Sequence, residues 1–233
     1  ISVPKTGLVE LSTVGPAFNG KKHLPRDNHD KPLRSKQPCV YAIWNDLFHE
    51  DVPEEFIRSV FAVMMDDYVR PKHKFLVLTK RADRMAEMLG RWEREGLKFQ
   101  REGILLGVSV EDQKTADERI PLLLATPAVN RFVSYEPALG PVDFRNYLWH
   151  EDCDDFDCDL LACSMTSIGR GIEWIIMGAE TSHGARNMHP DWARKVRDDC
   201  NEAGVPFFMK KMSGGQPTPK DLKIREFPEE VSK

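Results

Sequence analysis

The stretch KFLVLTKRADRMAEMLGRWEREGLKFQREGILLGVSVED (residues 74–112) decides the fold, because it indicates a strand, a helix and a second strand in succession. Its first apolar run ends in Lys80-Arg81 and its second in Glu111-Asp112. Between the two, apolar residues recur at helical spacing, and Gly96 ends the predicted helix. Such a unit predicts two neighbouring parallel strands joined by a right-handed crossover.

The same alternation extends in both directions along the chain. Four further apolar runs predict strands, at residues 39–44, 131–135, 173–177 and 205–209. About six parallel strands, most of them separated by helices, predict an α/β fold and a partial (β/α) TIM-like barrel. No glycine-rich phosphate loop follows any of these strands. Ligands of such folds bind beyond the carboxyl ends of the strands, where this chain carries its polar and charged clusters.

The remaining segments interrupt this rhythm within what we predict to be a single domain, 1–233. Residues 1–38 are predicted to be irregular, and 212–233 to form an extended surface tail. Residues 143–171 indicate an insertion, with a run of six acidic residues at 151–159 and the cysteines Cys153, Cys158 and Cys163. The spacing of these cysteines differs from that of zinc sites, so a variable loop is favoured over a metal site.

Composition narrows the class of protein. The chain has 233 residues, of which 41% are hydrophobic and 30% charged, with a net charge of -4. No apolar run reaches the roughly 18 residues of a membrane span, and no signal peptide is evident. No basic patch supports non-specific binding to nucleic acid. An odd number of cysteines, five, argues against a disulfide scaffold and for a cytoplasmic protein.

Candidate site residues stand at the strand ends. Lys80 and Arg81 would hold a carboxylate or phosphate, since cations are unfavourable at the start of a helix without such a partner. Glu111 could bind hydroxyl groups, and Glu136 could accept a proton if burial raised its pKa. Turns, caps and salt bridges, such as one between Glu136 and Arg131, are the structural alternatives. The predicted catalytic residues are Glu136, Glu111 and Lys80; the predicted cofactor-binding residues are Asn45, Asp46, Arg81, Ser109, Gly178, Glu180 and Thr181; no metal ligand is predicted.

Seven of these segments, taken in order, carry a resemblance. They are NDLFHEDVPEEFI (45–57), VLTKRADRM (77–85), GVSVEDQ (107–113), ADERIPLLLATPA (116–128), RFVSYEPALGPVD (131–143), GAETSHGARNMHPDW (178–192) and AGVPFFMKK (203–211). Together they resemble a family of phage and bacterial proteins that looks like a divergent branch of the radical S-adenosylmethionine (SAM) enzymes. The resemblance covers roughly residues 30–212.

The resemblance implies a fold, two cofactors and a reaction. Members usually begin with a cysteine segment that ends in a Cys-x-x-Cys-Tyr-Ala-like run and would hold a [4Fe–4S] cluster. This chain has no cysteine before Cys39, so either the cluster ligands lie upstream of Ile1, as we expect, or the protein has lost them and radical chemistry is excluded. By resemblance, the cluster and SAM would generate a 5′-deoxyadenosyl radical that modifies a polar substrate, such as a phage nucleobase or DNA.

Two other functions stay open at this point. One is a non-radical barrel enzyme with acid–base chemistry at Glu136 or Glu111. The other is a barrel without catalysis that binds beside a protein partner.

Overall fold

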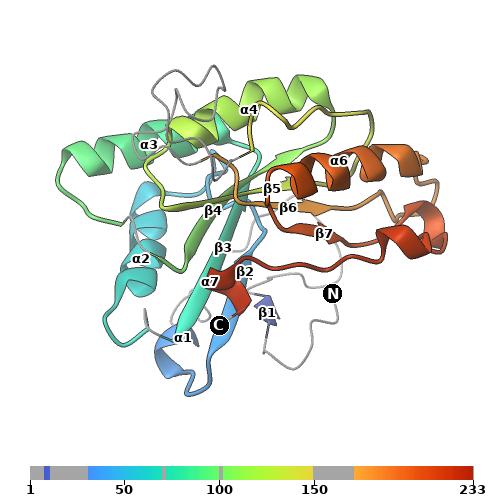
Figure 1. The fold of residues 1–233 in the computed structure, drawn as a ribbon. Coiled ribbons are helices and arrows are strands. Elements are labelled where there is room, and N and C mark those ends of the chain that lie inside the picture. The colour runs from blue at the N-terminus through green and yellow to red at the C-terminus, as the bar shows by residue number, and fades with distance from the viewer. Residues whose placement is uncertain (1–7, 11–30, 70–71, 100–101, 149–170, 233) are drawn as a thin grey trace.

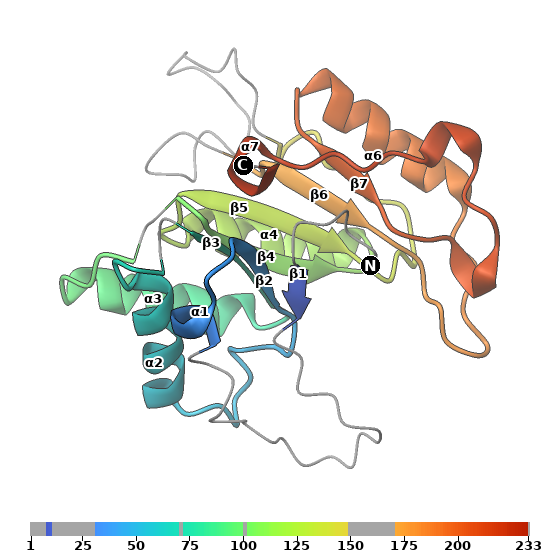
Figure 2. The ribbon, with the colours of Figure 1, turned by 90° about the horizontal axis from the view of Figure 1, so that it is seen from below.

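The computed structural model describes residues 8–10, 31–69, 72–99, 102–148 and 171–232, drawn in colour in Figure 1. Seven parallel strands form one sheet in the sequential order β1-β2-β3-β4-β5-β6-β7. The sheet curls into a half-barrel with helices between its strands, as Figures 1 and 2 show from two sides. The predicted α/β fold and partial barrel are therefore confirmed, while the acidic insertion falls mainly on 149–170, outside the described residues, as do its three cysteines.

The predicted strands all occur in the sheet. Their bounds are β2 Cys39–Ile43, β3 His73–Thr79, β4 Ile104–Val110, β5 Asn130–Tyr135, β6 Trp174–Met177 and β7 Phe207–Met209. An additional strand, β1 Leu8–Glu10, pairs with β2 inside the segment that we predicted to be irregular. Three residues without a sustained pattern give no period to detect, so β1 escaped prediction.

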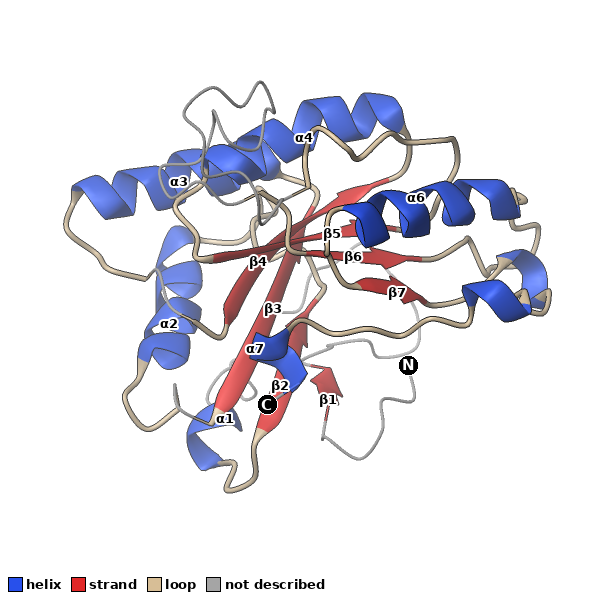
Figure 3. Ribbon diagram, viewed as in Figure 1, coloured by secondary structure: helices blue, strands red, loops and turns tan. Residues whose placement is uncertain are grey.

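The longer helices cover the outer face of the sheet (Figure 3). The longer helices are α2 Glu54–Met65, α3 Ala82–Arg94, α4 Gln113–Ala125 and α6 Pro190–Glu202, and the short ones are α1 Lys31–Arg34 and α7 Glu229–Ser232. The α3 helix forms where the sequence predicts it, with Met85, Met88, Leu89 and Trp92 buried on one face. Cys200 is buried on the inner face of α6.

Alternate residues of each strand enter two separate apolar clusters. In β3, Phe75 and Val77 join the large cluster beneath the helices, whereas Leu76 and Leu78 join a smaller cluster on the other face of the sheet. This is the period of two that a strand imposes on its side chains. The sheet is therefore apolar on both faces, which leaves the strand ends as the place for polar chemistry.

The segment after β7 differs from the predicted extended tail. It contains two 3-10 turns, Ser213–Gly215 and Lys220–Leu222, and then pairs antiparallel with β7 at Arg225. Phe227 and Val231 pack against the smaller apolar cluster. Glycines and prolines suggested surface chain, but a few apolar side chains are enough to fold the segment back onto the sheet. None of the described helices is long and apolar enough to cross a membrane.

Candidate functional site

The carboxyl ends of β2–β7, together with the residues that follow them, form the candidate site and are called the rim below. Asp46 lies just beyond β2 in the left-handed region, with φ 36°. Such a backbone is uncommon outside glycine, asparagine and aspartate, and strained positions of this kind gather at functional sites. The chain therefore holds the Asp46 carboxylate in a defined place.

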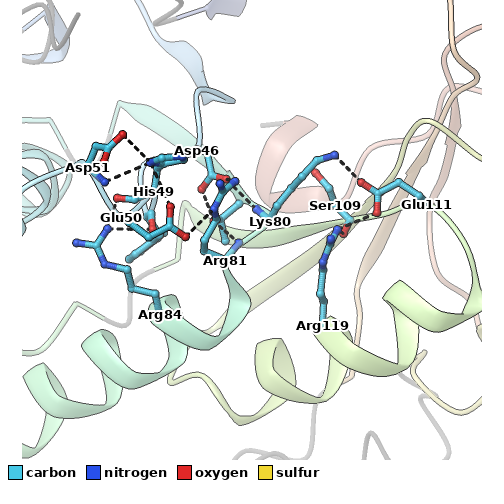
Figure 4. A network of polar contacts seen from close by, with 12 residues as sticks. Asp46, His49, Glu50, Asp51, Lys80, Arg81, Arg84, Ser109, Glu111 and Arg119 are labelled. Carbon is cyan, nitrogen blue, oxygen red and sulfur yellow. Dashed lines mark hydrogen bonds and ion pairs between the residues drawn. The ribbon is translucent and has the colours of Figure 1, made fainter. Parts of the chain in front are cut away.

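Three groups of the next strand end bind the Asp46 carboxylate. The Thr79 hydroxyl donates to Oδ1, the Lys80 backbone N–H donates to Oδ2 at 3.3 Å, and the Arg81 guanidinium donates to Oδ2 at 2.6 Å. The Thr79 hydroxyl also accepts the Arg81 backbone N–H at 2.9 Å. Figure 4 shows this network. Asp46 thus joins the ends of β2 and β3 and balances the charge of Arg81.

Glu111 extends the same network to β4. Its Oε1 accepts from the Lys80 ammonium, and its Oε2 accepts from Arg119 of α4 at 2.8 Å. Arg119 also donates to the backbone carbonyl of Ser109 at 2.8 Å (Figure 4). Both oxygens of Glu111 are therefore occupied by cations, which gives this carboxylate a structural role and leaves neither oxygen free for a substrate.

Arg84 and Glu50 support this side of the rim. Arg84 donates to the carbonyls of Phe48, His49 and Val52, and so anchors the loop after β2 on helix α3. Glu50 lies 3.3 Å from Arg81, and a backbone hydrogen bond and Arg81 lower the pKa of the Glu50 carboxyl. Sequence reasoning missed Arg84 and Arg119, because both lie inside helices, away from any strand end.

Glu136 and Lys210 form a second group at the ends of β5 and β7. The Lys210 ammonium donates to Glu136 Oε2 at 2.6 Å and lies 4.2 Å from the centre of the Trp44 ring. A Cβ atom at Gly178, the residue after β6, would approach Glu136 Oε1 to 2.7 Å, so the absence of a side chain at Gly178 leaves room for this carboxylate. Glu136 therefore forms a salt bridge, as its structural alternative predicted, but with Lys210 instead of Arg131. Arg131 is buried and donates to carbonyls near the end of α4.

Glu180 stands apart from both groups. Within the described chain its carboxylate contacts Arg186, at 2.9 Å from Nε, and these hydrogen bonds lower the pKa of Glu180 to about 2. Thr181 is exposed beside it. Asn45 is exposed next to Asp46, and Asp112 caps α4 through the Thr115 backbone N–H, as its structural alternative predicted. The structure thus joins Asp46, Lys80, Arg81 and Glu111 in one network, Glu136 in another and Glu180 in a third.

The described cysteines do not fit an iron–sulfur cluster. A [4Fe–4S] cluster needs about three or four thiolates at one place. Cys39 begins β2, at the opposite end from the rim, and Cys200 is buried in α6, where burial raises the pKa of its thiol. No group of three His, Cys, Asp or Glu side chains in the described ranges could hold a metal ion.

Comparisons with known proteins give one match. A family model described as "Protein of unknown function (DUF5131)" matches residues 5–226. No curated protein and no solved structure matches the chain.

Proposed function

The chain belongs to the DUF5131 family, and we propose that it is a SAM-binding enzyme whose ligand site is the rim of the half-barrel. One observation carries the proposal. The rim gathers carboxylates, cations and an aromatic ring from the ends of β2, β3, β4, β5 and β7. SAM carries an anionic carboxylate and cationic ammonium and sulfonium groups, and the cations, the carboxylates and the aromatic face of the rim complement them.

The residues of the chain would divide the work of binding. Trp44 offers an aromatic face, and Glu136 and Lys210 offer one charge of each sign close to it. Glu180 and Arg186 offer a separate and more exposed pair after β6. When bound, SAM supplies an electrophilic sulfonium carbon for transfer chemistry. The rim residues would orient that group toward a polar substrate, such as a small molecule or a nucleobase.

No step of this proposal is routed through an iron–sulfur cluster, whose ligands are expected upstream of Ile1 and not among the described residues. The proposal is therefore tested on SAM binding by the chain itself. The free thiols of Cys39 and Cys200 support a reducing, cytoplasmic location.

A second candidate function rests on the same pair of residues. Glu136 and Lys210 share a hydrogen bond at the rim, so a proton could pass between a substrate and this pair without SAM. Of the two predicted carboxylates, Glu136 is the better placed for this role, because cations bind both oxygens of Glu111.

Equilibrium dialysis of labelled SAM against the full chain tests the first proposal. We expect saturable binding of one SAM per chain, weakened at least about tenfold by Trp44→Leu. Tyr68→Leu is the matched control, because Tyr68 also lies against a lysine, with Lys72 Nζ 3.2 Å from its ring centre, but outside the rim. Absence of binding at millimolar SAM, or equal loss in both variants, would contradict the proposal.

A further inference from the structure

The curl of the sheet brings Trp44 and Lys210 together across the rim. Trp44 follows β2 and Lys210 follows β7, and four strands stand between them in the sheet order. Neighbouring strands are about 4.8 Å apart, so a flat sheet would separate β2 from β7 by roughly 24 Å. The Lys210 ammonium nevertheless lies 4.2 Å from the Trp44 ring centre. The two residues thus face each other across the concave side of the half-barrel.

The Glu136–Lys210 ion pair beside Trp44 is largely shielded from solvent. The side chain of Lys210 is 12% exposed and that of Glu136 is 25% exposed. Within the described chain, the Glu136 carboxylate is hydrogen-bonded only to Lys210. Each charge therefore depends on the other, and removing one alone would leave its partner poorly solvated and unpaired.

The Trp44 indole adds an unused donor. Its Nε1 is buried and has no hydrogen-bond partner in the described structure. Buried donors are nearly always satisfied, so an orphaned one beside an ion pair indicates a missing acceptor.

We propose that Glu136, Lys210 and Trp44 form a subsite for an α-amino-acid group. Its ammonium would bind Glu136 and the Trp44 face, and its carboxylate would bind Lys210 and the indole N–H. A ligand with both charges replaces the internal ion pair by two new ones and leaves no charge unpaired. A purely anionic ligand would bind Lys210 and leave Glu136 without a partner, and a purely cationic ligand would bind Glu136 and leave Lys210 without one.

The amino-acid group can come from two sources, the methionyl end of SAM or a free amino acid. If it comes from SAM, this inference rests on the proposed function. Titration calorimetry with SAM, methionine and methylthioadenosine separates the two sources, since methylthioadenosine lacks the amino-acid group and the sulfonium charge, and methionine carries the amino-acid group without the nucleoside. We expect SAM to bind at least tenfold more tightly than methylthioadenosine. Lys210→Met should abolish that difference while leaving methylthioadenosine binding unchanged.

Two further variants keep the test independent of folding. Glu136→Gln preserves side-chain size and should weaken SAM but not methylthioadenosine. Lys72→Met removes the lysine of the other lysine–aromatic contact and should change neither affinity. Thermal unfolding of each variant shows whether it remains folded.

The outcomes separate the two proposals. Equal affinity for SAM and methylthioadenosine would overturn the subsite and leave SAM binding standing. Binding of methionine but not SAM, lost in Lys210→Met, would support the subsite and overturn the proposed function. Binding of neither SAM nor methionine would overturn both.

Discussion

The two halves of the rim hold their charges differently. In the β2–β4 half, Asp46 binds side chains and a backbone N–H, and Glu111 binds two cations. In the β5–β7 half, the Glu136 carboxylate is held by Lys210 alone within the described chain. A carboxylate that accepts several hydrogen bonds holds strands and loops together. A carboxylate that binds a single lysine can release that lysine and bind a ligand instead. The first half is therefore structural, and the second half is the place for a ligand.

The largest effect on stability is expected at Asp46. Asp46→Ala should lower the free energy of unfolding by roughly 2–3 kcal/mol, because it leaves Arg81, Thr79 and a backbone N–H without their acceptor. Urea unfolding measures the loss. Glu136→Ala is the matched truncation in the other half and should cost less, roughly 1–2 kcal/mol, because it leaves one donor without its acceptor instead of three. Equal losses in the two variants would remove the distinction between the halves.

Glu111 should show a smaller effect of the same kind. Glu111→Gln leaves Lys80 and Arg119 without a charged partner, and we expect a loss of about 1–2 kcal/mol. The loss should shrink in high salt, because the Lys80 side chain is 47% exposed. A salt-independent loss, measured by the same urea unfolding, would show that packing and not charge is responsible.

Acid sensitivity should arise away from the rim, at His73 of β3. Burial lowers the pKa of His73, whose Nδ1 accepts the Cys39 backbone N–H at 3.2 Å. The unfolded chain takes up this proton below about pH 6.5, while the folded chain resists it. Stability from this group is thus complete above about pH 6.5 and falls as the pH drops below it. Thermal unfolding between pH 7.5 and 5 measures the slope.

His73→Asn should flatten that slope, although it lowers stability at neutral pH. His183→Asn, at an exposed histidine beside the rim, is the control and should leave the slope unchanged. If the slope survives in His73→Asn, acid sensitivity lies elsewhere.

The smallest effect on stability is expected at Gly178. A methyl group there displaces the Glu136 carboxylate, whose Oε1 would otherwise lie 2.7 Å away, and the side chain can turn toward solvent. We expect Gly178→Ala to cost less than about 1 kcal/mol but to weaken SAM binding as Glu136→Gln does. Gly90→Ala, whose nearest contact would be an ordinary 3.5 Å, should leave binding unchanged. Unchanged binding in Gly178→Ala would exclude Glu136 from the site.

The sequence predicts the sheet well because its strands are apolar runs with clear ends. Strand-end logic also places Asp46, Arg81, Lys80 and Glu111 on adjacent strands, where the structure joins them. The sequence does not predict contacts that form only because the sheet curls into a half-barrel. Trp44 therefore appeared as the last residue of a strand, and its meeting with Lys210 required the half-barrel.

Other features depend on contacts with little local signal. Arg119 reaches Glu111 from inside α4, and Glu180 pairs locally with Arg186 instead of joining the Asp46 network. The segment after β7 carries turn residues in sequence, yet Leu222 is fully buried. In each case a long-range packing contact outweighs the local preference.

Nuclear magnetic resonance of the Trp44 indole N–H tests the central claim most directly. The chain has five tryptophans, and Trp44→Phe identifies the resonance of this one. On titration with SAM, the Trp44 resonance should move and saturate with the measured affinity, because the indole gains an acceptor. SAM binding that leaves the Trp44 resonance in place would contradict the claim that the ligand enters the rim between β2 and β7.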